Sequence, residues 1–74
     1  MKQEEKDALI QFHKALVFFH KRHIVKLETN MKAITAELHD PNKRFEIESM
    51  GLEIRSHILL ASISNSIIVF LEGF

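Results

Sequence analysis

The amino-acid sequence predicts an all-α fold: an antiparallel hairpin of two helices, over about 4–38 and 41–71, that is completed by another chain. Apolar residues recur every three or four positions through both segments, and the 74 residues include only two glycines and one proline, which indicates long helices. Strong turn chemistry occurs at one place only, which indicates that the two helices form a single domain, 1–74.

The turn is predicted at Asp40 and Pro41, within the sequence LHDPNKRF. Aspartate is a favourable N-cap, and proline suits the first helical position because its missing N–H would be unpaired there. Proline also moves the residue before it out of the helical region, so the first helix is expected to end near Leu38 or His39. Gly51 costs the second helix about 1 kcal/mol relative to alanine, so a bend or a later start there is the alternative to a straight helix.

The first helix is expected to pack through one apolar row. At 100° per residue, this row contains Leu9, Phe12, Leu16, Phe19, Ile24, Leu27, Met31, Ile34 and Leu38. A smaller apolar patch on the opposite side contains Phe18 and Val25, seven residues apart. This patch is more apolar than the solvated back of a helix usually is.

The second helix has two apolar rows about 160° apart. The row expected to face the first helix contains Ile47, Met50, Ile54, Ile58, Ala61, Ile68 and Val69. The other row contains Phe45, Leu52, Leu59, Ile63, Ile67, Phe70 and Leu71. A helix that is apolar on two sides is buried on two sides, and the first helix can cover only one of them. The second row, together with Phe18 and Val25, is therefore the predicted interface with a partner chain.

Size and charge support the same interpretation. A chain of 74 residues builds only a marginal core, and without cysteine no disulfide can reinforce it, so a second chain is the remaining source of stability. Residues 1–44 contain nine Lys or Arg against six Asp or Glu, whereas 45–74 contain one against four. The two halves of a hairpin therefore have complementary charge. The net charge of zero argues against nucleic acid as the main partner.

The apolar end of the sequence is not predicted to span a membrane. The uncharged run over 56–71 is shorter than the roughly 20 residues that a span needs, and it contains four serines, Asn65 and His57. The opening residues, MKQEEKDAL, lack the basic and apolar regions of a signal peptide. With the absence of cysteine, these features indicate a cytoplasmic protein.

Five histidines invite a metal interpretation. His13, His20 and His23 fall among the apolar residues of the first helix, and His20 and His23 form an i, i+3 pair that could ligate one ion. A closed zinc site needs a fourth ligand, for which the facing row of the second helix offers only Asn65 and Glu72. No metal site is therefore predicted. The three histidines are expected at the edge of a narrow core, with their polar tips in solvent.

No catalytic residue, cofactor or enzymatic activity is predicted either. General acid–base catalysis needs two groups with different pKa values in a cleft, which a two-helix hairpin does not provide. The carboxylates occupy solvated or flanking positions: Glu4, Glu5, Asp7, Glu28, Glu46, Glu48 and Glu53.

The sequences ELHDPNKRF and ASISNSIIVFL, at the turn and in the second helix, give the chain a resemblance to a family. Over roughly 23–71, it resembles the small cytoplasmic co-chaperones of bacterial type III secretion needle subunits. The matching residues are Leu38, Asp40, Pro41, Phe45, Leu52, Ile58, Ala61, Ile67 and Ile68. Needle subunits themselves share a proline-containing turn, but their second helix is longer and their first lacks this richness in histidine and lysine.

The resemblance implies a protein–protein interaction module whose apolar helix face docks on a helical-repeat chaperone. Together the two proteins would keep the needle subunit unpolymerised. The alternative function is a self-associating structural or regulatory protein, in which two hairpins form a homodimeric four-helix bundle.

Overall fold

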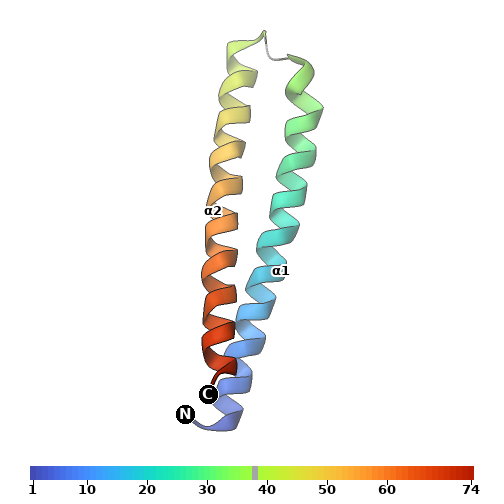
Figure 1. Cartoon of the computed structure of the whole chain (residues 1–74). Helices are drawn as coiled ribbons and strands as arrows, with labels where there is room; N and C mark the ends of the chain where they lie inside the picture. The colour runs from blue at the N-terminus through green and yellow to red at the C-terminus, as the bar shows by residue number, and fades with distance from the viewer. Residues whose placement is uncertain (38) are drawn as a thin grey trace.

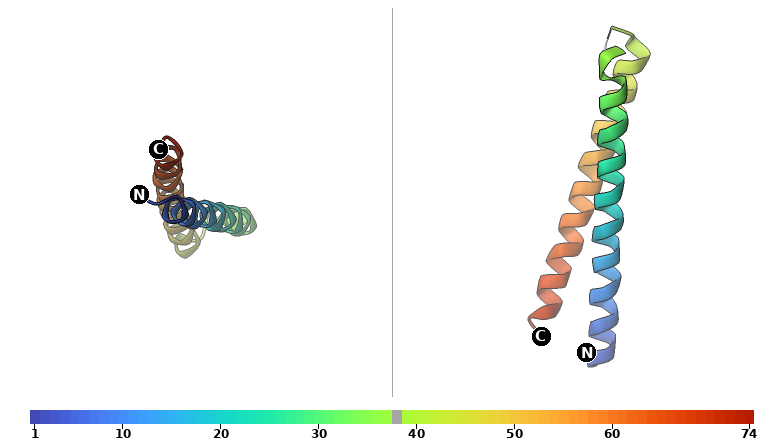
Figure 2. Two further views of the ribbon diagram at one scale, coloured as in Figure 1. Left: turned by 90° about the horizontal axis from the view of Figure 1, so that it is seen from below. Right: turned by 90° about the vertical axis from the view of Figure 1, so that its right-hand side faces the viewer.

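The computed structural model describes residues 1–37 and 39–74 and confirms the all-α hairpin. It contains helix α1 (Gln3–Ile34), a short 3-10 helix η1 (Thr35–Glu37) and helix α2 (Pro41–Glu72). The two long helices lie side by side in a rod of 56 × 14 × 13 Å, with both termini at one end and the turn at the other (Figure 1). Their axes cross at an angle instead of running parallel (Figure 2). Because α1 gives way to η1 after Ile34, its regular part is shorter than the sequence predicted; Leu38 lies outside the described residues.

The turn is capped as predicted. Asp40 has an extended backbone, with φ −86° and ψ 119°, and its Oδ1 accepts a hydrogen bond of 2.9 Å from the backbone N–H of Asn42. Pro41 occupies the first position of α2. Lys43 lies 3.9 Å from a carboxylate oxygen of Glu37 and 3.7 Å from one of Glu46, and such exposed ion pairs contribute little to stability. The start of α2 therefore depends mainly on the Asp40 cap.

Replacing Asp40 with alanine is expected to lower the free energy of unfolding by roughly 0.5–2 kcal/mol, because the N–H of Asn42 loses its acceptor. Pro41→Ala is the matched control and should have a much smaller effect. Proline has no backbone N–H, so its replacement removes no hydrogen bond. Urea denaturation of both variants measures the difference. Equal and negligible effects would contradict the role of the cap.

Helix α2 is continuous through Gly51, so the helix does not start late there. A Cβ atom added to Gly51 would have no neighbour within 4 Å beyond the helix's own backbone. The glycine thus meets no close-packing requirement in the hairpin. Its cost in helix propensity is absorbed by the packing of the turns on either side.

The helices face each other through two rows with alternating steps of three and four residues, the spacing of antiparallel packed helices. All members of the two rows are buried or half-buried. The row of α1 is Ile10, His13, Val17, His20, Ile24, Leu27, Met31 and Ile34, and the row of α2 is Ile47, Met50, Ile54, His57, Ala61, Ser64, Ile68 and Leu71. Two hydrogen bonds join these rows, one between His13 and Ser64 (3.3 Å) and one between His20 and His57 (2.7 Å).

The core is thin. Its buried apolar cluster consists of Ile10, Val17, Ile68 and Leu71, near the end of the hairpin where the termini lie. Among the described residues, no side chain is less than 2% exposed. A well-packed domain encloses its largest apolar side chains fully, so the isolated hairpin lacks a complete core.

The predicted core rows need correction at several positions. In α1, Leu9, Phe12 and Phe19 are exposed. The step from Phe19 to Ile24 is five residues, a rotation of about 140°, so these three residues lie on a row beside the core row that passes through Ile24. In α2, Ile58 and Val69 are also exposed. The core positions directly beside Phe12, Phe19 and Ile58 are occupied instead by histidines, His13, His20 and His57.

Candidate partner-binding face

A second pair of apolar rows runs beside the core, one on each helix. Each again alternates steps of three and four residues, and together we call them the apolar face: Leu9, Phe12, Leu16 and Phe19 of α1 with Leu60, Ile63, Ile67 and Phe70 of α2. Leu9 and Leu60 directly precede equivalent core positions on their helices. In an antiparallel hairpin, such positions lie on the same side of the molecule.

Ring contacts between the two helices show that side chains on this side of α1 reach α2. The ring of Phe19 lies 6.4 Å from that of His57, and the ring of His23 stacks on His57 at 5.1 Å with an interplanar angle of 16°. Ile67 packs against the buried cluster. The apolar face is therefore one surface that crosses from helix to helix.

Most of this face is open to solvent. Phe12 is 58% exposed, Ile63 48% and Phe70 67%, while Leu16 and Ile67 are half-buried. The other broad side of the hairpin, the polar side, carries Asp7, Lys14, Lys21 and Glu28 of α1 with Arg55, Ser62, Asn65 and Glu72 of α2, and the exposed apolar residues Phe18, Val25, Ile58 and Val69 lie among them. The apolar face has no charged member, and an exposed apolar surface of this kind is typical of a side that is covered by another molecule.

The residues predicted as a partner interface fall into four groups. Ile63, Ile67 and Phe70 belong to the apolar face. Phe45, Leu52 and Leu59 are exposed at intervals of seven residues on the side of α2 away from α1, and we call them the outer row. Phe18 and Val25 are exposed on α1, but not on the apolar face. Leu71 was placed wrongly: it is 4% exposed and lies in the core, because it continues the row of Ser64 and Ile68.

Sequence reasoning missed the contribution of α1 to this surface, since it assigned Leu9, Phe12 and Phe19 to the core. It also left out Leu60, which is 46% exposed. The five-residue step after Phe19 was the signal that could have separated the two rows of α1.

The histidines are arranged differently from the prediction. His20 is 8% exposed, and its Nδ1 is 2.7 Å from Nδ1 of His57 on α2. His23 is half-buried against His57. Burial lowers the pKa of His20 from its ordinary value of 6.5, and the charges that His57 and His23 can carry lower it further. His20 is therefore a core residue and not an edge residue.

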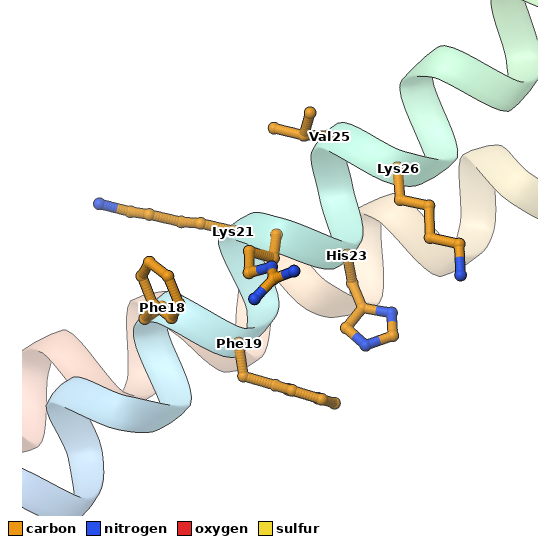
Figure 3. A pocket seen from close by; sticks show the side chains of 7 residues that line it. Phe18, Phe19, Lys21, His23, Val25 and Lys26 are labelled. Atoms are coloured by element: carbon orange, nitrogen blue, oxygen red, sulfur yellow. The ribbon is translucent and has the colours of Figure 1, made fainter.

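The surface of α1 next to these histidines forms an open depression (Figure 3). Its seven lining residues all belong to α1: Phe18, Phe19, Lys21, Arg22, His23, Val25 and Lys26. Phe18, Lys21 and Val25 point to one side of the helix, whereas Phe19, His23 and Lys26 point to another. The guanidinium of Arg22 lies 5.9 Å from the centre of the Phe18 ring. Side chains that diverge from a single helix do not enclose a ligand, so this depression is not a small-molecule site.

Among the described residues, no three His, Asp or Glu side chains are grouped so that they could hold a metal ion. Added zinc at a stoichiometric amount is accordingly expected to leave the melting temperature of the chain unchanged, because an ion that does not bind the native state cannot stabilise it. Thermal unfolding followed by circular dichroism, with zinc and with a chelator, tests this. A rise of several degrees with zinc would contradict it.

Helix α2 is long and apolar enough to cross a membrane. Its most apolar window of 18 residues has a mean hydropathy of 1.6, and 22% of that window is buried in the hairpin. Core helices of soluble proteins can be equally long and apolar, but they are mostly buried. The low burial of α2 in the hairpin is consistent with a covering surface of low polarity, whether protein or lipid.

Comparisons of the chain with known protein families, with curated proteins and with solved structures found no match.

Proposed function

We propose that this chain is a protein–protein interaction module that lays its apolar face and the outer row of α2 into an apolar groove of a helical partner protein. The observation that carries the proposal is the area of the surface. A compact monomer of 8.6 kDa exposes about 4,700 Å², whereas this chain exposes 5721 Å². The excess of about 1,000 Å² is similar to the area that one partner loses in a typical stable interface, about 800 Å².

The distribution of apolar residues on α2 favours a concave partner. Exposed apolar side chains extend around this helix from Leu60, beside the core, through Ile63 to Leu59 on the outside. A flat partner covers the apolar face and leaves the outer row in water. A groove that surrounds α2 covers both, as grooves between helical repeats do for amphipathic helices.

This geometry fits the role that the family resemblance implies, a cytoplasmic bacterial co-chaperone that binds a helical-repeat chaperone. Such a protein needs no catalytic group, and the binding energy comes from apolar side chains. The absence of charge over 56–71 is consistent with a buried contact, since charged residues are depleted at the centres of interfaces.

The second candidate is a homodimer in which two apolar faces pack against each other as a four-helix bundle. Its support is the composition of the face, where Phe12 and Phe19 of α1 lie on the same side as Ile63 and Phe70 of α2. In this arrangement each helix contributes its core row and one adjacent row, the usual pattern in four-helix bundles. The outer row, including Leu52 and Leu59, would remain exposed.

Site-specific photo-crosslinking in the native host separates the two candidates. A photoreactive phenylalanine is introduced at Phe70 on the apolar face, at Leu59 on the outer row, or at Ser62 on the polar side as the matched control. The proposal expects Phe70 and Leu59 to crosslink to the same second protein and Ser62 to crosslink to neither it nor another. A homodimer would instead give a product of twice the mass of the chain from Phe70 and none from Leu59. Equal crosslinking from Ser62 would contradict both.

A further inference from the structure

The hydrogen bond between His20 and His57 joins the two helices near the middle of the hairpin. The 2.7 Å distance joins Nδ1 of one ring to Nδ1 of the other. An imidazole nitrogen donates when it carries a hydrogen and accepts only when it does not. The bond therefore requires that at least one of the two rings accept through a nitrogen without a proton, that is, that at least one ring be neutral.

Protonation of both rings has two consequences. The hydrogen bond is lost because two N–H donors then face each other, and two positive charges are held within hydrogen-bonding distance in the core. Like charges at such a distance repel strongly where water is largely excluded, and His20 is 8% exposed. Relief comes when the helices separate and the two rings are hydrated.

The surroundings of the pair do not offset this repulsion. On α1, His23 is a third titratable ring, which stacks on His57, and Phe19 contacts all three. The nearest carboxylate on α2 by sequence, Glu53, lies one helical turn before His57 and is exposed. Lys21, Arg22 and Lys26 add positive charge on the neighbouring turn of α1. In the described part of the chain, the salt bridges found join Lys43 to Glu37 and Glu46 and involve no histidine.

We propose that the His20–His57 pair is an acid-sensitive latch, which holds α1 against α2 near neutral pH and releases the middle of the hairpin when both rings are protonated. The latch sits directly beneath Phe19 of the apolar face and beside His23. Its release therefore alters the surface that faces the partner. This inference goes beyond the proposed function and holds for the isolated chain whether or not a partner binds.

The direction of the pH effect follows from proton linkage. In the unfolded chain His20 takes up a proton near its ordinary pKa of 6.5, whereas in the hairpin its pKa is lowered. Below about pH 6.5 the unfolded state therefore binds more protons than the native state, and the free energy of unfolding falls. The stabilisation is fully present above this pH and is lost as the pH falls through the lowered pKa of the folded state.

Melting temperatures measured by circular dichroism at pH 7.5, 6.5 and 5.5 test the latch in the full chain. This range stays above the ordinary pKa values of Asp and Glu, about 3.9 and 4.3, so carboxylates contribute little. The wild-type chain is expected to lose about 5 °C or more between pH 7.5 and 5.5. The control His39→Gln, at an exposed position before the turn, should lose as much. The double variant His20→Leu/His57→Leu should lose much less, because leucine fills two core positions without titrating.

Two results would overturn the proposal: a wild-type melting temperature that is flat over this range, or a double variant that loses as much as the wild type. Proton NMR of the wild-type chain provides a measurement that does not depend on the folding of a variant. The ring signals of His20 should titrate with a midpoint below 6.5. A His20 midpoint at 6.5 or above would show that there is no latch.

Discussion

Replacing Ile68 with aspartate is expected to unfold the isolated chain. Ile68 is 7% exposed and packs in the only buried apolar cluster that the described residues form, with Ile10, Val17 and Leu71. An unpaired carboxylate in such a place costs several kcal/mol. The whole free energy of unfolding of a chain this size is about 4–11 kcal/mol, and this hairpin has a thin core. Far-UV circular dichroism should show most of the helical signal lost.

Val69→Asp is the matched control. Val69 is the next residue along α2 and is 71% exposed, so the same charge there remains hydrated and the helical signal should persist. Ile58→Asp should also be tolerated, although the sequence placed Ile58 in the core, because its side chain is 53% exposed. If Val69→Asp unfolds the chain while Ile68→Asp does not, the two sides of α2 have been assigned in reverse.

Replacing Ile63 with aspartate is expected to abolish binding to the partner and to leave the hairpin folded. Ile63 is 48% exposed in the middle of the α2 row of the apolar face, where burial of a charge against a partner is most damaging. A loss of 2 kcal/mol or more corresponds to an affinity lowered by about 30-fold or more. Titration of the variant against the partner that crosslinks to Phe70, or the dimer dissociation constant if that partner is a second copy, measures the loss.

Ser62→Asp, one residue earlier and on the polar side, is the control and should bind like the wild type. Unchanged affinity of Ile63→Asp would contradict the apolar face as the contact. Cosedimentation with phospholipid vesicles gives the lipid alternative its own measurement. If the wild-type chain binds vesicles and Ile63→Asp does not, a bilayer covers this surface and the protein–protein proposal is wrong.

Local chemistry explains why the hairpin and its turn could be predicted. The Asp40 cap and Pro41 act through their own backbone neighbours, so the sequence around them contains all the information that is needed. The regular spacing of Ile47, Met50 and Ile54 likewise places them on one side of α2 regardless of what they meet.

The choice of core row could not be predicted in the same way. Ile10 and Leu9, or His20 and Phe19, are neighbours on a helix that is apolar over a wide arc, and periodicity does not select between adjacent rows. The facing helix determines which row of α1 is buried. On α2, the small residues Ala61 and Ser64 allow the helices to approach closely. Close approach leaves no room for the phenylalanines between the helices, so they lie to one side.

The histidine pair was missed for a related reason. His20 and His57 lie on different helices, and their interaction depends on how the two rows align across the hairpin. Each helix read alone shows a histidine near an apolar row, which is usually an edge residue. Only the alignment of the two helices shows that these rings bond to each other in the core.

The position of the buried cluster, at the end of the rod opposite the turn, determines when this chain can fold during its synthesis. Ile10 and Val17 are synthesised before their partners Ile68 and Leu71, which follow only after most of both helices. Closing a loop of this length has an entropic cost, and the core positions nearer the turn, such as Ile34 and Ile47, are only half-buried. Nascent α1 therefore remains without its partner helix, with Phe12 and Phe19 exposed, until α2 has left the exit tunnel almost completely.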